Sequence, residues 1–227
     1  MGKIIAVASG KGGTGKTSFT ACVGLSLAAM GYETLALDCD ITLRNLDLAL
    51  GLSDSAAMDF SDVLEGRCTL EEAAVRHRKY PKLSLLAAPL APVGARFSQT
   101  AMQALGQAIR QQYDYCLIDA PAGLGEGFQL ATAIADSVIV VTTTDPAALR
   151  DAQRTVMELR RFPAGQVHLV EPGAEENAEG TPLHHRRRHG HGGPSPAGRD
   201  PGGRRHSAGP EPGHPLTGYE LLRPTGL

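Results

Sequence analysis

The sequence lacks several features that would point to particular classes of protein. It has no Trp, only 4% aromatic residues and a formal net charge of -2, so its overall charge does not favour a nucleic-acid partner. Its four cysteines are scattered without a C-x-x-C pair, which argues against a disulfide framework or a zinc site. Neither a basic, apolar leader nor a run of about 18 apolar residues is present, so we expect a soluble, cytoplasmic chain.

The composition changes abruptly after residue 170. Residues 171–227 hold 12 of the 27 Gly and 9 of the 15 Pro, but no Val, Ile, Phe, Met or Cys. Such a segment cannot bury enough apolar surface to offset the entropy lost on ordering its chain, so disorder is expected there. The sequence therefore predicts a folded domain at residues 1–170 and a tail at residues 171–227 without a fold of its own.

Residues 1–170 alternate short apolar runs with helical patterns. Near-continuous apolar strands separated by helices are typical of a buried sheet, so we predict a doubly wound, mostly parallel α/β fold. Ligands of such sheets bind at the carboxyl ends of the strands. The predicted strands are Lys3–Ala8, Thr34–Leu37, Leu83–Leu86, Tyr113–Ile118, Ser137–Val141 and Val167–Val170, and the predicted helices are Ser18–Met30, Phe97–Gln111, Gly127–Ala135 and Ala147–Arg161.

A glycine-rich segment between the first predicted strand and helix matches the phosphate-binding pattern G-x-x-x-x-G-K-[ST]. In this setting backbone N–H groups converge on phosphate oxygens, and the helix N-terminus adds a favourable dipole. We predict that Lys16 neutralises the β- and γ-phosphates and that the Thr17 hydroxyl binds Mg²⁺. The alternative is a turn that only joins strand and helix. The candidate nucleotide-binding residues are Gly10, Lys11, Gly12, Gly13, Thr14, Gly15, Lys16, Thr17 and Ser18.

Two carboxylates follow predicted strands. Asp119 ends an apolar strand, as in a Walker B segment, and is expected to hold Mg²⁺ through water. An ordinary turn aspartate is the alternative for this position. Asp40 follows the second strand and is the candidate for positioning or activating an attacking water, against the alternative that it caps the next element.

The segment from Lys11 to Thr17 resembles the deviant Walker A motif of the MinD/ParA/Fe-protein ATPases, and the resemblance extends over residues 2–170. In that family the early lysine reaches across an ATP-dependent homodimer to the partner's phosphates, which implies a catalytic role for Lys11 beside Lys16 and Asp40. The segment 38–51 is similar to switch I of the MinD branch, although Thr42 replaces its usual glycine. Asp145-Pro146 resembles a loop where the family more often has Asn-Pro.

The resemblance implies an ATPase that uses ATP and Mg²⁺ in placing the division septum. It further implies partner proteins that inhibit septum formation and stimulate hydrolysis, and peripheral binding to anionic membrane through a C-terminal helix that this chain lacks. One alternative is a ParA-type partition ATPase, which needs a basic DNA-binding face. Another is a truncated product with impaired activity. A nitrogenase-type reductase would need cluster-binding cysteines, and none is suitably placed.

The tail departs from the family pattern at a definite point. In that family the strand that matches Val167–Val170 continues into Val-Asn-Arg-Val, and the Asn contacts the nucleotide base. In this sequence, residues 171–174 read Glu-Pro-Gly-Ala instead. Codons read one base later permit Asn-Arg-Val, and the same offset at 206–215 permits a sequence similar to the end of the family's ATPase domain. We therefore predict that 171–227 are translated out of frame. A disordered linker and a metal-binding tract at His184, His185, His189 and His191 are the alternatives.

Overall fold

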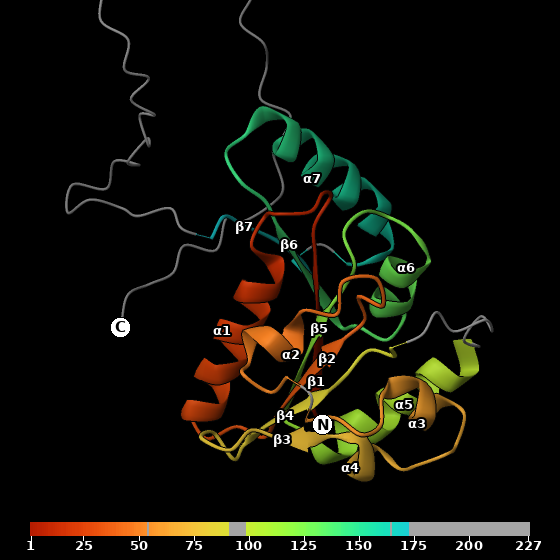
Figure 1. The fold of residues 1–227 in the computed structure, drawn as a ribbon. Helices are drawn as coiled ribbons and strands as arrows, with labels where there is room; N and C mark the ends of the chain where they lie inside the picture. Colours follow the sequence, from red (N-terminus) through yellow and green to blue (C-terminus); the bar gives the residue numbers. More distant parts are fainter. Residues whose placement is uncertain (54, 91–98, 164, 173–227) are drawn as a thin grey trace, which may run out of the picture. The chain divides into compact units, whose positions relative to one another are not determined.

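The computed structural model describes residues 1–53, 55–90, 99–163 and 165–172. Within them, seven strands form one sheet in the order β3-β4-β2-β5-β1-β6-β7, with helices on both faces (Figure 1). Neighbouring strands run parallel, except that β3 and β4 are antiparallel. The predicted doubly wound α/β fold is confirmed. The strands are Lys3–Ala8 (β1), Thr34–Asp38 (β2), Val75–Arg76 (β3), Leu83–Leu86 (β4), Tyr115–Asp119 (β5), Ser137–Val141 (β6) and Val167–Val170 (β7).

The four longest helices lie where the apolar periodicity predicts helices. Helix α7 (Pro146–Glu158) ends earlier than predicted because the chain tightens into a 3-10 turn at Leu159–Arg161. The prediction that the fourth strand begins at Tyr113 is wrong, because the Tyr113 N–H still donates to the Ile109 carbonyl at the end of a helix. The helices are Lys16–Ala29 (α1), Leu46–Ala49 (α2), Phe60–Leu64 (α3), Leu70–Ala73 (α4), Gln99–Gln112 (α5), Glu126–Ala133 (α6) and Pro146–Glu158 (α7).

Three short helices and strand β3 were not predicted. Elements of this length contain too few turns to show a hydrophobic period, so their evidence lies in their caps. Asp59 begins α3 with a capping box. Its side chain accepts the backbone N–H groups of Ser61 and Asp62, and the Asp59 backbone N–H donates to the Asp62 side chain. Thr69 and Glu72 form the same reciprocal arrangement at the start of α4. These capping-box signatures were the available sequence signal for α3 and α4.

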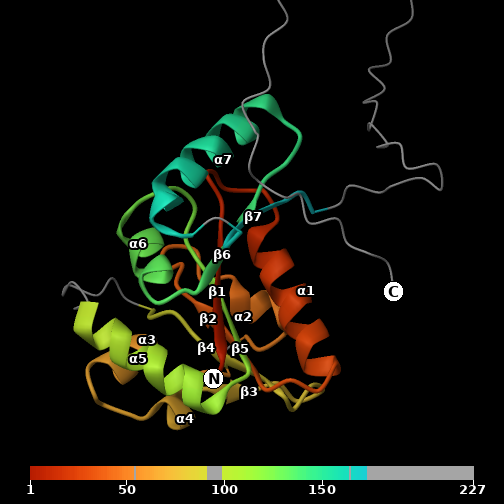
Figure 2. The ribbon, with the colours of Figure 1, turned by 180° about the vertical axis from the view of Figure 1, so that it is seen from behind.

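The sheet buries a different set of side chains on each face. Alternate residues along β2 point in opposite directions, so Leu35 and Leu37 belong to one core cluster and Ala36 to the other. Helices α1 and α2 cover the face that includes Ala36, and α3 to α7 cover the opposite face (Figure 2). Both faces of the central strands are therefore shielded, which accounts for their continuous apolar sequence.

Three adjacent strands bring their carboxyl ends together. Strand β5 lies between β2 and β1, so Asp119 at its end is the register partner of both Asp38 and Val7. The glycine-rich segment follows β1 immediately. Three regions far apart in sequence are thereby placed at one edge of the sheet, as expected for a ligand site in this architecture.

Strand β7 pairs only with β6 among the described residues, so it forms one edge of the sheet there. The described segments contain no helix with the length and apolar character needed to cross a bilayer. Residues 173–227 lie outside the described residues, and so does nearly all of the segment predicted to be disordered or out of frame.

Replacing Leu37 tests the assignment of the core. Leu37→Ala should lower the free energy of unfolding by about 2–5 kcal/mol, because this β2 side chain is fully buried and its loss leaves a cavity. Leu48→Ala is the matched control, since Leu48 is 62% exposed on α2 and should change stability by no more than about 0.5 kcal/mol. Urea unfolding of both variants checks the difference, and equal losses would contradict the assignment.

Candidate nucleotide-binding site

The loop between β1 and α1 has a backbone suited to binding an anion. Gly13 and Gly15 adopt positive φ angles of 78° and 86°, a conformation that side chains disfavour. Gly15 begins α1, and no side chain within the described residues caps the first turn, so the N–H groups there are open to a ligand. Gly10 must be a glycine for another reason, because an added Cβ would lie only 2.5 Å from the backbone carbonyl carbon of Asp151 in α7.

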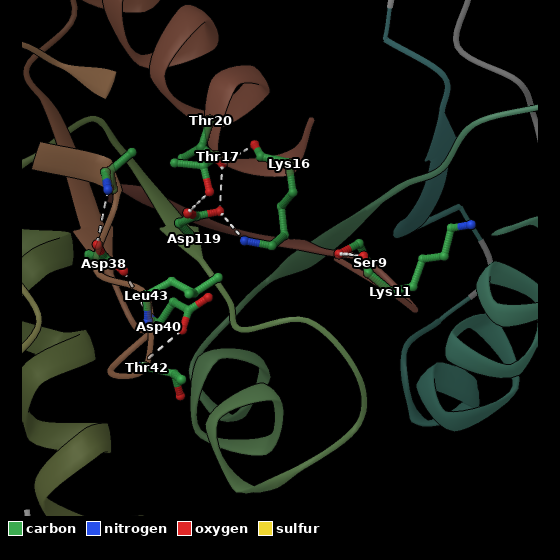
Figure 3. Close-up of polar contacts among 11 residues, drawn as sticks. Ser9, Lys11, Lys16, Thr17, Thr20, Asp38, Asp40, Thr42, Leu43 and Asp119 are labelled. Carbon is green, nitrogen blue, oxygen red and sulfur yellow. Dashed lines mark hydrogen bonds and ion pairs between the residues drawn. The ribbon is translucent and has the colours of Figure 1, made fainter. Parts of the chain in front are cut away.

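The first turn of α1 aims its polar side chains at Asp119 (Figure 3). Lys16 Nζ lies 2.7 Å from Asp119 Oδ1, and the Thr17 hydroxyl donates to Oδ2 of the same carboxylate at 2.7 Å. The Thr20 hydroxyl lies 3.3 Å from Oδ1 and also bonds the Lys16 carbonyl. Lys16 and Asp119 are both buried, and each neutralises a charge that would be costly to bury alone.

The predicted residues Lys16, Thr17 and Asp119 are thus brought together, but the contact between Lys16 and Asp119 was not predicted. The sequence pattern assigns Lys16 to phosphate groups, whereas the structure pairs it with the carboxylate. A lysine only 7% exposed needs a counter-charge, and Asp119 supplies it. Thr20 was also missed, although its place one helical turn after Lys16 puts it on the same side of α1.

The chemistry of these side chains fits Mg²⁺. A carboxylate and a hydroxyl are hard oxygen ligands, and Mg²⁺ in phosphate sites typically takes one or two carboxylates, substrate phosphates and waters. The Thr17 hydroxyl and the Asp119 carboxylate are hydrogen-bonded to each other, so they are close enough to bind the same ion. Within the described segments, no group of three or more His, Cys, Asp or Glu could hold a metal independently.

Asp38 is a site residue that sequence reasoning missed. It is 1% exposed beside Asp119, and burial raises its pKa to about 7, with repulsion from Asp119 and Asp40 adding to the increase. Backbone N–H groups of Asp40 and Leu46 donate to its carboxylate at 2.9 and 3.2 Å and oppose that rise. The available signal was its position at the end of a strand, two residues before Asp40.

Asp40 is buried, and its carboxylate organises the following loop. Its Oδ1 accepts the backbone N–H groups of Thr42 and Leu43, each at 3.1 Å. Its carbonyl accepts the N–H of Arg44, which has a φ of 43°. These are the contacts expected if Asp40 caps the segment that follows it. The role of Asp40 in positioning or activating an attacking water stays a prediction.

Lys11 extends from the loop in a different direction from Lys16 (Figure 3). Its Nζ lies 2.7 Å from Asp145 Oδ2, and Asp145 also caps α7 by accepting the Ala148 N–H. The hydrogen bond from Lys11, supported by that from Ala148, lowers the pKa of Asp145. Because this ion pair is exposed, it adds little to stability and can exchange partners readily.

The remaining predicted residues occupy the same loop and helix turn. Gly12, Gly13, Gly15 and Ser18 are exposed, whereas Thr14 is buried with a hydroxyl that has no hydrogen-bond partner in the described part of the chain. The turn after Asp119 is tied to the loop, because the Gly123 N–H donates to the Ser9 carbonyl at 3.0 Å.

Comparison with known proteins gives consistent matches. Residues 2–164 match the family model described as AAA domain. The septum site-determining protein MinD of Synechocystis sp. is 40% identical over 170 residues, which make up 75% of this chain and 64% of that protein. The chain therefore spans less than two thirds of that relative's length.

Two solved structures have similar folds. In the MinC:MinD cell division protein complex of Aquifex aeolicus, the matching chain gives a TM-score of 0.63 at 36% identity, covering 74% of this chain and 68% of that one. The septum site-determining protein MinD of Pyrococcus horikoshii, complexed with Mg-ADP, gives a TM-score of 0.65 at 32% identity. The match covers 78% of this chain and 73% of that one.

The raised pKa of Asp38 predicts a dependence of stability on pH. Between the ordinary value of 3.8 and about 7, the folded chain keeps a proton that the unfolded chain releases. Stability from this group should therefore be complete below about pH 4 and fall by up to about 1.4 kcal/mol per pH unit as the pH rises toward 7. Asp38→Asn removes this component, so wild type should lose stability relative to the variant over that range.

Urea unfolding at a series of pH values, without added magnesium, measures the difference. The amide that Asp38→Asn introduces keeps an oxygen that can accept the same backbone N–H groups, so the comparison isolates the charge. Two stability curves that stay parallel from pH 4 to about 7 would contradict the prediction.

Proposed function

The chain belongs to the MinD group of P-loop ATPases, and from this premise we propose that it binds and hydrolyses MgATP in placing the division septum. The observation that carries the proposal is the convergence of Lys16, Thr17 and Asp119 at the start of α1, whose first-turn N–H groups are not capped by any side chain of the described residues. Lys16 provides a cation, Thr17 and Asp119 provide metal ligands, and the backbone N–H groups provide an anion-binding site, all in one place.

Phosphate binding follows from the first turn of α1. The loop's N–H groups and Lys16 together would neutralise the β- and γ-phosphates of a nucleotide. Thr17 and Asp119 would hold Mg²⁺, which supplies charge neutralisation between the phosphates. The Mg-ADP bound by the Pyrococcus horikoshii relative supports the choice of nucleotide and metal.

Hydrolysis would depend on Lys11 and Asp40. Lys11 is held on the side of the loop away from Lys16 by an exposed ion pair, which leaves its ammonium available for another anion. We infer that in an ATP-dependent homodimer it reaches the partner's phosphates and stabilises the charge that develops during phosphoryl transfer. Asp40, at the end of β2, would orient the attacking water.

The Min system supplies the proposed partners. The Aquifex aeolicus relative is found in a MinC:MinD complex, which supports a septum-inhibiting partner for this chain as well. A second partner would stimulate hydrolysis. The protein would work in the cytoplasm and at the inner face of the cell membrane.

Substituting Lys16 tests nucleotide binding. Lys16→Ala should weaken binding of MgADP by about 10- to 100-fold, because it removes a charge-assisted contact to phosphate. Lys3→Ala is the control, since Lys3 is exposed at the opposite end of β1 and should leave affinity unchanged. Calorimetric titration gives the affinities, and circular dichroism confirms that both variants are folded. Equal affinities would contradict the assignment.

Substituting Lys11 separates turnover from binding. Lys11→Ala should keep MgADP affinity within about threefold yet reduce ATP hydrolysis by about 100-fold, since its contact is made only in the dimer. Asp145→Asn is the control, because it removes the ion-pair partner while Asn still caps α7. Phosphate release and sedimentation with ATP measure turnover and dimerisation. A Lys11→Ala variant that hydrolyses ATP at the wild-type rate would refute the role given to Lys11.

A further inference from the structure

His77 makes three hydrogen bonds that define its protonation state. It follows β3, and its Nδ1 accepts the backbone N–H groups of Lys79 and Tyr80, each at 3.1 Å. A nitrogen that accepts two N–H groups carries no proton, so in the neutral ring the hydrogen is on Nε2. That nitrogen lies 3.1 Å from the carbonyl oxygen of Leu50, to which it donates.

Leu50 is the C-cap of α2, a helix of four residues that is too short to be stable alone. Its other end is held at the candidate site, because the Leu46 N–H donates to Asp38 Oδ2 at 3.2 Å. Leu46 and Leu50 are both buried in the core cluster shared with α1. The helix is therefore fixed at its N-terminal end by a site carboxylate and at its C-terminal end by His77.

We propose that His77 is a positioning residue: its neutral Nε2–H form holds α2, and the Leu46 N–H of α2 orients the Asp38 carboxylate, which the register of β2 and β5 places beside Asp119. A second proton can enter the ring only at Nδ1, where it would displace the N–H groups of Lys79 and Tyr80. Such a proton would open the turn, whereas Nε2 would keep the hydrogen that it donates to the Leu50 carbonyl. The effect on nucleotide binding rests on the proposed MgATP function, whereas the effect on α2 does not.

The charged and titratable groups around the ring do not replace these bonds. Its own hairpin carries Arg76, Arg78, Lys79 and Tyr80, with the Tyr80 ring 5.3 Å from that of His77. Helix α2 carries Asp47. In the described part of the chain none of these forms an ion pair with His77.

Two substitutions separate the two sides of the ring. His77→Gln places an amide N–H near the position of Nε2 and keeps a donor for Leu50, whereas His77→Asn places an oxygen near Nδ1 and keeps the acceptor for the turn. His168→Gln is the matched control, because it removes the histidine of β7. All variants are made in the full 227-residue chain.

Hydrogen exchange, expressed as protection factors, is the primary measurement. At about pH 8, His77→Asn should lower the protection of the Leu46 and Leu50 amides by about tenfold, the value of one hydrogen bond, and leave Lys79 and Tyr80 unchanged. His77→Gln should lower the protection of the Lys79 and Tyr80 amides and leave that of Leu46 and Leu50 unchanged. His168→Gln should leave the protection at both places as in wild type.

Nitrogen-15 spectra of wild type give a test that does not depend on any variant folding. They should show a neutral His77 with its proton on Nε2 at about pH 8. A proton on Nδ1, or α2 protection that is equal in both His77 variants, would overturn the proposal.

Titration with MgADP gives the functional readout. Affinity of His77→Asn should fall by about three- to tenfold at about pH 8, and that of His77→Gln should stay near wild type. Equal affinities of the two variants would overturn the link from α2 to the site. If wild type itself bound no MgADP, the proposed function would fail, while the exchange data would still decide the role of His77 in holding α2.

Discussion

The buried pair of Lys16 and Asp119 is the interaction on which the rest of the site depends. Each charge would be expensive to bury alone, and their 2.7 Å contact requires that β1 and β5 be adjacent and in register. The strand order thus determines the electrostatics: the helix that follows β1 presents a cation to the carboxylate that ends β5. Thr17 and Thr20 bond the same carboxylate, so it is surrounded by donors from one helix turn.

Around this pair, the carboxyl ends of neighbouring strands concentrate negative charge. Asp38 and Asp119 are register partners, and Asp40 follows two residues later. Burial raises the pKa of Asp38 to about 7, and repulsion from Asp119 and Asp40 adds to the increase. A site with excess carboxylate and one buried lysine is suited to a ligand that brings its own divalent cation. This charge balance is consistent with a metal–nucleotide substrate.

Much of the fold follows from the sequence, because long apolar periods and the glycine-rich motif are local signals. The longer helices and the strands that were predicted lie close to the observed positions, and the loop joins β1 to α1 as expected. The contacts of Lys16 with Asp119 and of Lys11 with Asp145 could not be predicted, since each depends on which distant strands become neighbours. Short elements such as α2 depend on contacts at their ends, which periodicity does not reveal.

The close packing of Gly10 against Asp151 has a consequence for the order of folding. The glycine-rich loop is flanked by the backbone of α7, and its bonds to Asp119 and Asp145 span 103 and 134 residues of sequence. Closing such long loops is slow relative to forming local turns. The motif therefore completes these contacts only after α7, far along the chain, has been synthesised.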